Sequence, residues 1–242
     1  IEPVFNFVTD DYQGLQSTEI EGCFSTFGDL DGDGDEDMIA GTANGFLYYY
    51  ENVANSGSPM SLSLVDTAFM NINNGPFATP RLIDLNGDTL LDLVIGEYNG
   101  NLNYHQNTGT SSIAQFSDTP TVDTLGGIHF YNPFLEGFIC VDFGNADSTG
   151  ELFAFVGTQD GTVYIYDSIS QNLNAGNHFR LVDSLMTYNA HTAVAAGNIN
   201  FSDSLELILG EAGGGISLWG RTAMYIPPVD TDSIGDTTLV RE

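Results

Sequence analysis

The residues best suited to chemistry lie in an acidic loop of nine residues near the start of the chain. Acidic side chains stand at positions one, three, five and nine, and the backbone carbonyl of position seven is available as a fifth ligand. In order, these positions are Asp29, Asp31, Asp33, Asp37 and, for the carbonyl, Asp35. Alternate side chains can point inward while the glycines let the backbone turn sharply, and oxygen ligands suit calcium. The loop therefore predicts a calcium site.

A second loop repeats this spacing. Its candidate ligands are Asp84, Asn86, Asp88, Asp92 and the carbonyl of Leu90. Oxygen-only ligands on a flexible loop favour calcium over magnesium, which requires a tighter octahedron. Without a cation, carboxylates crowded so closely would repel one another. Two loops of this kind predict two bound calcium ions.

Two later loops are degenerate, and we expect little metal binding from them. The loop at 142–147 has the wrong length and is expected to bind nothing. The loop Asn198–Glu206 keeps the spacing but has one carboxylate at the side-chain ligand positions, so it predicts a hydrogen-bonded turn, with a weak extra site as the alternative. An EF-hand is excluded because its twelfth loop position requires glutamate, and that position is Ala40 or Ile95 here.

The loops belong to a repeat whose period is marked by glycines. Gly41, Gly96, Gly157 and Gly210 each end a short apolar run, at spacings of 55 (96 − 41), 61 (157 − 96) and 53 (210 − 157) residues. A turn and a second apolar run with alternating polarity follow each glycine. Such alternation, repeated four times, predicts strand–turn–strand units.

Further strand-like segments complete each unit. Outer segments follow the second strand at 61–67, 114–119 and 179–184, and the matching phrase of the fourth unit stands at 4–10. We therefore predict an all-β fold, a β-propeller of four four-stranded blades closed by the N-terminal strand. A fragment of a larger ring is the alternative. Residues 1–220 would form the propeller, and residues 221–242 an acidic, proline-containing tail or linker.

Composition excludes several partners. The 242 residues carry 33 acidic side chains against 4 Lys plus Arg, a formal net charge of −29. This surface would repel nucleic acid and anionic lipid. No stretch is apolar enough to enter a membrane, and the two cysteines, Cys23 and Cys140, are expected to be buried thiols, with a single bridge as the alternative.

The sequence shows no catalytic motif. The four histidines are scattered and no G-x-S-x-G elbow is present. The aromatic residues Tyr48–Tyr50 and Trp219 could stack on a sugar, but packing between blades is the favoured explanation. We therefore expect no catalytic residues.

The pattern D-x-D-G-D-G-x-x-D followed by an apolar strand and glycine resembles the FG-GAP/VCBS repeat of integrin α-chain propellers and of many secreted bacterial proteins. The resemblance covers nearly all of the chain before the tail. It implies a β-propeller in which structural calcium is held between the first and second strands of a blade, with ligands meeting the opposite face or the blade edges.

From this resemblance we expect a secreted or cell-surface, bacterial, non-catalytic binding or adhesion module that recognises a protein or carbohydrate. One alternative is the propeller domain of a polysaccharide-degrading, lyase-like enzyme, and another is a subunit of a self-associating surface fibre. We do not expect nucleic-acid binding or direct membrane insertion.

Overall fold

The fold is built from four antiparallel β-sheets. The computed structural model describes residues 22–55, 57–130, 137–145, 150–187, 190–199 and 205–220. The first sheet contains β1 (Phe24–Gly28), β2 (Asp37–Gly41), β3 (Leu47–Asn52) and β4 (Leu62–Asp66), and the second contains β5 (Thr79–Ile83), β6 (Asp92–Gly96) and β7 (Leu102–His105). The third contains β8 (Ile139–Asn145), β9 (Leu152–Thr158), β10 (Thr162–Asp167) and β11 (Arg180–Met186), and the fourth contains β12 (Ala193–Gly197), β13 (Glu206–Gly210) and β14 (Ile216–Gly220).

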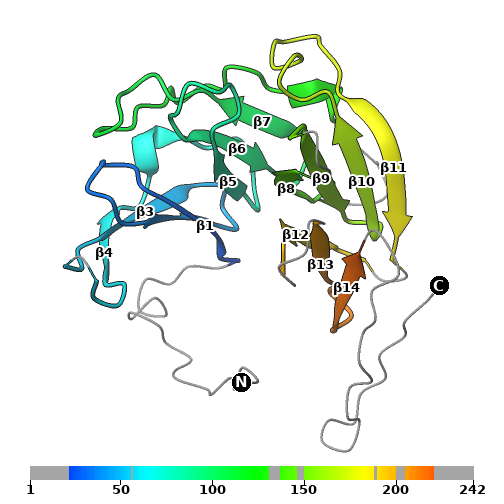
Figure 1. Cartoon of the computed structure of the whole chain (residues 1–242), viewed down its shortest axis with the longest axis horizontal. Helices are drawn as coiled ribbons and strands as arrows, with labels where there is room; N and C mark the ends of the chain where they lie inside the picture. The colour runs from blue at the N-terminus through cyan, green and yellow to red at the C-terminus, as the bar shows by residue number, and fades with distance from the viewer. Residues whose placement is uncertain are drawn as a thin grey trace, which may run out of the picture.

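The sheets are arranged like the blades of a propeller. Figure 1 shows them side by side along an arc, with the first strand of each sheet (β1, β5, β8 and β12) toward a common axis. An open sector separates the fourth sheet from the first. The all-β prediction is confirmed, and in the described part of the chain the helical turns are the 3-10 segments η2 (Phe69–Asn71) and η3 (Leu125–Gly127). No helix of these residues could span a membrane.

The hydrophobic cores lie between neighbouring sheets. Alternate residues of a strand face opposite sides of its sheet. On β6, Leu93 and Ile95 therefore join the cluster shared with the first sheet, while Val94 joins the cluster shared with the third. A third cluster, containing Phe155 and Leu209, joins the third and fourth sheets. The middle strands β2, β6 and β9 are buried on both faces, and their side chains are correspondingly apolar on both faces.

The repeated glycines allow the sheets to approach closely. A Cβ atom built on any of the first three would come within 3.0 Å of a backbone carbonyl oxygen just before or at the start of the next inner strand. The contacts are Gly41 with Ala78, Gly96 with Ile139 and Gly157 with Thr192. Real Cβ atoms essentially never come so close. Each of these three repeat glycines therefore marks a junction between neighbouring sheets.

Four-stranded blades were predicted throughout, and this is wrong for the second sheet. Residues 114–119 form no strand. The N–H of Ala114 instead donates to the carbonyl of Leu30 at 2.9 Å, and the N–H of Gln115 donates to the side chain of Asn107 at 3.0 Å. The first bond holds the segment against the first acidic loop, while on β7 the backbone of Tyr104 pairs with Val122 instead of with this segment. The outer strands predicted at 61–67 and 179–184 are present as β4 and β11.

Other expectations concern the chain ends and the cysteines. The expected closing strand at 4–10 and the tail at 221–242 lie outside the described residues. Both cysteines are free thiols. Cys140 is buried as expected, and burial raises its pKa to about 11, whereas Cys23 is exposed and its predicted burial is wrong.

We expect Gly96→Ala to destabilise the protein by about 1–3 kcal/mol, because the added methyl group would overlap the Ile139 carbonyl. The matched control is Gly197→Ala, where no atom of the described residues lies within 4 Å of the added carbon. The control should change the free energy of unfolding by no more than about 0.5 kcal/mol. Urea unfolding measures both, and equal effects would contradict the proposed role of the junction.

Candidate functional site

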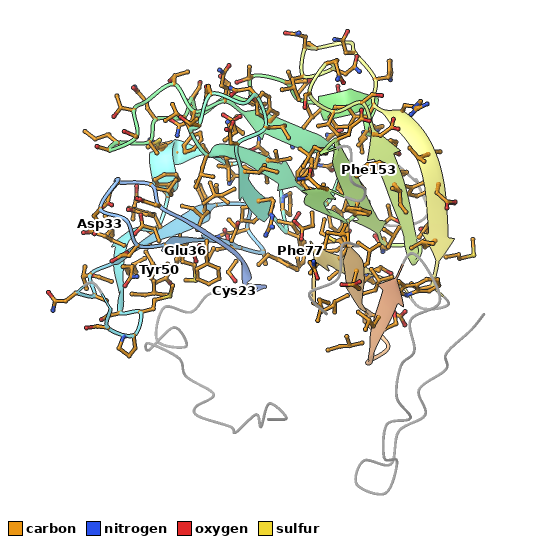
Figure 2. All side chains as sticks on the ribbon, viewed as in Figure 1. Cys23, Asp33, Glu36, Tyr50, Phe77 and Phe153 are labelled. Atoms are coloured by element: carbon orange, nitrogen blue, oxygen red, sulfur yellow. The ribbon has the colours of Figure 1, made fainter. Side chains whose placement is uncertain are left out.

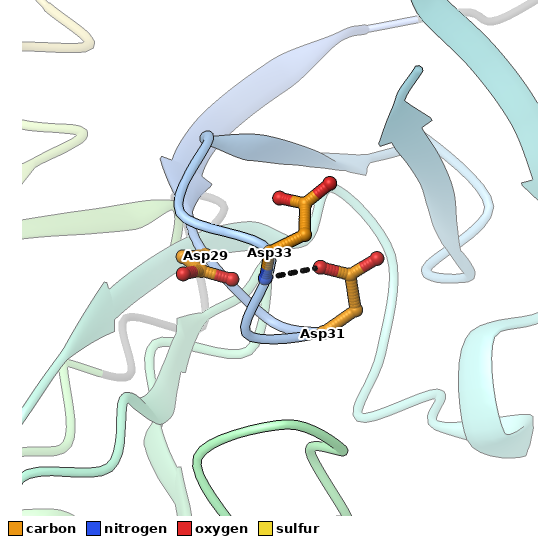
Figure 3. A group of neighbouring side chains, drawn as sticks. All are labelled: Asp29, Asp31 and Asp33. Atoms are coloured by element: carbon orange, nitrogen blue, oxygen red, sulfur yellow. Dashed lines mark hydrogen bonds between the residues drawn. The ribbon is translucent and has the colours of Figure 1, made fainter. Parts of the chain in front are cut away.

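The first acidic loop gathers three carboxylates, as Figure 3 shows. Oxygen atoms of Asp29, Asp31 and Asp33 lie within 4.8 Å of one another. The backbone wraps around them: the N–H groups of Gly32 and Gly34 donate to Asp29 at 2.6 and 3.1 Å, and the N–H of Asp33 donates to Asp31 at 3.1 Å. The backbone of the loop thus surrounds the three carboxylates, and a hard divalent cation could be coordinated by their oxygen atoms.

Asp35 adds an oxygen that the sequence did not assign. Its carbonyl was the expected ligand, but the structure also shields the side-chain Oδ1 from solvent without a hydrogen-bond partner. Desolvation, followed by the charges of Asp33, Asp37, Asp31 and Asp29, raises the pKa of Asp35. A shielded, unpartnered carboxylate oxygen is unfavourable unless a cation or a proton accompanies it. The donor set therefore fits a calcium ion.

The aspartate at loop position nine has a second role. Asp37 is buried, and its carboxylate accepts hydrogen bonds from the N–H groups of Leu30 at 3.2 Å and Asn52 at 2.9 Å and from the Tyr49 hydroxyl at 3.0 Å. These bonds tie the second residue of the loop to the sheet. A carboxylate offers about four lone-pair sites, so these three hydrogen bonds leave about one site with which Asp37 could contact a metal.

The same arrangement recurs in two other sheets. Asp92 accepts from the N–H groups of Leu85 at 3.3 Å and Asn107 at 2.8 Å and from the Tyr104 hydroxyl at 2.9 Å. Glu206 in the fourth sheet accepts from the N–H of Ile199 at 2.9 Å. The carboxylate at loop position nine thus accepts a hydrogen bond from the second residue of the loop in three of the four sheets.

The second loop is held by internal hydrogen bonds. Asp84 accepts from the N–H groups of Gly87 and Thr89 at 2.8 and 2.9 Å, and the Asn86 amide donates to Asp88 at 2.9 Å. Thr89 has φ 72°, a left-handed conformation that glycine supplies in the first loop. Among the described residues, a cluster of three metal-ligating acidic groups occurs at the first loop alone.

The remaining loops differ. In the third sheet Phe153 takes the register position of Asp37 and Asp92, so this position carries no carboxylate there. Residues 146–149 and 200–204 lie outside the described residues, so the third loop and the weak fourth site stay predictions.

Aromatic side chains gather at the opposite end of the inner strands. Phe77, Phe138 and His191 share one register position, two residues before the residue that pairs with the repeat glycine. The Phe138 ring lies 5.5 Å from that of Phe24 and 5.8 Å from that of His191, and Phe77 stacks on Tyr98 at 5.8 Å. The N–H of Gly137, beside Phe138, donates to the Tyr98 carbonyl at 2.7 Å. We call these five aromatic residues the axial aromatic group, and Figure 2 shows Phe77 inside the arc of the inner strands.

Two members of this group have a strained backbone. Phe77 and His191 have φ values of 55° and 57°, and Gly22 occupies the same position in the first sheet with φ 67°. Hydrogen bonds from Phe77 N–H to the Ala43 carbonyl and from His191 N–H to the Gln159 carbonyl, at 3.1 and 2.9 Å, hold this conformation. Glycine would satisfy the backbone without strain, so a side chain here points to function. These residues carry no sequence motif; they are recognised only by their register relative to the repeat glycines.

An ion pair between a buried aspartate and a partly exposed arginine joins the inner strands. Asp142 on β8 lies 2.7 Å from Nε of Arg81 on β5, and its other oxygen accepts from the N–H of Ala196 on β12 at 2.8 Å. Desolvation raises the pKa of Asp142, while Arg81 and two backbone hydrogen bonds act in the opposite direction. From the sequence, Asp142 was expected only in the degenerate loop at 142–147, whereas in the structure it lies on the inner strand β8.

Glu97 has a buried carboxylate next to the axial aromatic group. Glu97 precedes Tyr98 and accepts from the N–H and the side-chain amide of Asn99, at 2.6 and 2.8 Å, and from the N–H of Asn101 at 3.2 Å. Its orientation is therefore fixed.

The family model described as FG-GAP-like repeat matches residues 29–95, from the first acidic loop to β6. The chain contains an FG-GAP-like repeat. The resemblance read from the acidic loops is confirmed over this range. A search of curated proteins gave no match.

The chain is also similar in fold to solved structures. One is the catalytic domain of the Coprinopsis cinerea GH62 alpha-L-arabinofuranosidase, with TM-score 0.52 and 18% identity over 84% of this chain and 64% of that one. Another is a GH62 hydrolase in complex with xylotriose, with TM-score 0.50 and 14% identity over 88% of this chain and 67% of that one. The chain thus spans about two thirds of the length of these hydrolases.

These matches correct the expected function. The chain was expected to be a non-catalytic binding or adhesion module and not an enzyme, but the solved structures that share its fold are hydrolases. The prediction of a non-catalytic module is therefore wrong, and the alternative of a polysaccharide-degrading domain is better supported.

We expect Asp92→Ala to destabilise the protein by about 3 kcal/mol or more even in a chelator, because several buried donors would lose their acceptor. The control, Asp88→Ala, removes an exposed carboxylate of the same loop and should cost about 1 kcal/mol or less in chelator. Denaturant unfolding in EDTA measures both. Equal losses would show that position nine has no special role.

Asp142 should give the protein a specific pH dependence. Its pKa is raised above the ordinary 3.8, so its contribution to stability is present below that value and is lost as pH rises through the folded-state pKa. Relative to Asp142→Asn, the native protein should therefore lose stability as the pH rises above the ordinary aspartate pKa of 3.8. The exposed control Asp123→Asn should show no such trend in urea unfolding. A native-minus-Asp142→Asn difference that stays constant, or rises with pH, would contradict the assignment.

Proposed function

We propose that this chain is a glycoside-hydrolase-type domain that acts on a neutral polysaccharide outside the cell. The observation that carries the proposal is the fold shared with GH62 hydrolases over 84% and 88% of the chain. The net charge of −29 disfavours a polyanionic substrate, whereas neutral sugars of the kind those hydrolases bind or cleave are not repelled.

The axial aromatic group is the proposed sugar-binding surface. Aromatic faces offer large apolar area at low conformational cost, and binding sites are lined mainly by such side chains with a few fixed polar groups. Phe77 is 39% exposed, stacks on Tyr98 and keeps its side chain despite a left-handed backbone. Glu97 is fixed directly beside Tyr98.

Glycoside hydrolysis generally requires two carboxyl groups, one of them a proton donor with a raised pKa. Asp142 fits the donor because desolvation raises its pKa and because it lies on an innermost strand. Glu97 is the candidate for the second carboxylate. In the reaction, water adds across the glycosidic bond, the leaving oxygen takes a proton from the acid, and the base takes a proton from water.

Hydrolysis of 4-nitrophenyl α-L-arabinofuranoside and of neutral xylo-oligosaccharides tests the proposal. We expect turnover by the native chain and a loss of at least about 100-fold in Asp142→Asn, the scale of general acid catalysis. Asp167→Asn is the matched control, because Asp167 is also buried and paired with an arginine, Arg180, but on the outer strands β10 and β11. Phe77→Gly should raise KM more than it lowers kcat. No turnover of any neutral substrate, or equal losses in the two aspartate variants, would refute this function.

We also propose that the first two acidic loops bind calcium as a structural ion, held by the ligand sets predicted from the sequence. The clustered carboxylates and the unpartnered Asp35 oxygen support the first site. The finer architecture that we propose is a propeller in which the segment 4–10 pairs beside β14.

Calcium should stabilise the protein through the first loop. An ion present at about a hundredfold over its Kd adds roughly 2.7 kcal/mol per site. We expect EDTA to lower Tm and Asp31→Ala to abolish most of that response. Glu36→Ala, which removes an exposed acidic residue of the same loop that is not a predicted ligand, should keep it. A melting curve unchanged by EDTA would contradict calcium binding.

A further inference from the structure

One end of the first two sheets carries no exposed charge, although the chain as a whole is strongly acidic. The turn at 42–46 joins β2 to β3, the turn at 97–101 joins β6 to β7, and the segment at 73–78 leads into β5. Glu97 is the one charged side chain in these three stretches, and it is 0% exposed. At the other end of the same strands, the two acidic loops carry six and three acidic residues. The neutral end is the one at which the axial aromatic group lies.

Exposed asparagine side chains and an aromatic ring lie next to one another on this neutral end. The Asn73 amide donates to the Asn44 carbonyl at 3.3 Å, and Asn73 pairs with Phe46 in an isolated β-bridge. A Cβ built on Gly75 would lie 3.2 Å from the side-chain nitrogen of Asn99, so the second turn adjoins the same segment. The four exposed residues form a surface that we call the asparagine band: Asn44, Phe46, Asn73 and Asn99.

The fold does not require an amide at Asn44. Its Oδ1 accepts hydrogen bonds from the threonine hydroxyl two residues earlier and from the N–H two residues later, the latter at 3.2 Å. Asp160 occupies the same turn position in the third sheet, and its carboxylate accepts the same two bonds at 2.6 and 3.1 Å. Aspartate therefore closes this turn as well as asparagine does. Within the described part of the chain the NH₂ group of Asn44 makes no hydrogen bond, so it is available to a ligand.

The turn does not require an aromatic ring at Phe46 either. The residue five positions after the repeat glycine is Asn101 in the second sheet and Thr162 in the third, whereas Phe46 in the first is 36% exposed. An aromatic face packs against the apolar C–H face of a sugar ring, and a neighbouring amide offers both a donor and an acceptor to its hydroxyls. The asparagine band therefore has the chemistry of a carbohydrate surface.

We propose that the asparagine band binds the sugar units of a neutral polysaccharide that extend beyond the axial aromatic group. The inference rests on the proposed function and adds that the ligand is a polymer, held across the ends of the first two sheets. The two surfaces are continuous, because Asn99 directly follows Tyr98 of the aromatic group and Phe77 stacks on Tyr98. In a chain of net charge −29, an uncharged surface accepts a hydroxyl-rich chain without the repulsion that a polymer of uronic acids would meet.

Isothermal titration with trisaccharides and hexasaccharides of β-1,4-linked xylose, β-1,4-linked glucose and α-1,5-linked arabinose tests the band. The full chain carries Asp142→Asn, so that the sugars are not cleaved. We expect at least one hexasaccharide to bind about tenfold or more tightly than its trisaccharide, because only the longer sugar reaches the band. Asn44→Asp, which preserves the turn, and Phe46→Thr, which introduces the residue type of the third sheet, should each remove most of this preference and leave the affinity for the trisaccharide unchanged.

The control is Asp160→Asn, the reverse change at the equivalent turn of the third sheet, which should alter neither affinity. Thermal unfolding verifies that each variant is folded. The proposal would be overturned by equal affinities for every trisaccharide and hexasaccharide pair, by a preference that both band variants retain, or by equally tight binding of hexagalacturonate.

Turnover of 4-nitrophenyl α-L-arabinofuranoside by chains with native Asp142 separates this inference from the proposed function. This glycoside is too small to reach the band, so Asn44→Asp should cleave it at the native rate. Length-dependent binding without any turnover would support the band and count against hydrolysis. Turnover without length-dependent binding would support hydrolysis and overturn the band.

Discussion

The close packing of a glycine against a carbonyl oxygen of the next sheet is the constraint on which this structure depends. At Gly41, Gly96 and Gly157 the middle strand of one sheet contacts the backbone at the start of the inner strand of the next sheet. This contact fixes where each inner strand begins, and it therefore fixes the residues just upstream. The axial aromatic group consists largely of those upstream residues, so the junctions that build the fold also assemble the candidate sugar-binding surface.

The two ends of the inner strands have different chemistry for the same reason. The inner strands start at the aromatic end, and β1 and β5 finish at the two acidic loops. The loops are fastened by a buried carboxylate at position nine, through Asp37, Asp92 and Glu206, whether or not the other loop positions are acidic. The acidic motif therefore has two functions. The aspartates at the earlier loop positions bring negative charges together, and the carboxylate at position nine connects the loop to the sheet by hydrogen bonds.

Much of the fold could be predicted from the sequence, and the reason is local. Period-two alternation and turn glycines encode the strands of each hairpin, so the second and third strands of every repeat were found. The segment at 114–119 has the same alternation but is drawn to the first acidic loop by the hydrogen bond from Ala114 to Leu30, a contact between residues far apart in the chain. The local alternation of apolar and polar residues cannot show which of two possible partners a segment contacts.

The candidate site was less predictable because its parts are remote in sequence and carry no motif. Phe77, Phe138 and His191 become equivalent only when the strands are aligned on their paired glycines. Asp142 was assigned to a degenerate loop because its spacing was compared with Asp29 and Asp84, whereas β8 is longer than the other inner strands and carries this carboxylate on its ladder. The acidic loops drew attention to metal binding, and the non-catalytic interpretation followed from them.

Titration of the isotope-labelled chain with xylotriose, followed by NMR, tests the central claim most directly. The account predicts saturable shifts at the amides of Phe77, Tyr98, Phe138 and His191, at the end of the sheets that the glycine junctions assemble, with none at residues 29–37. Shifts confined to the acidic loops, or no shifts at millimolar sugar, would contradict it.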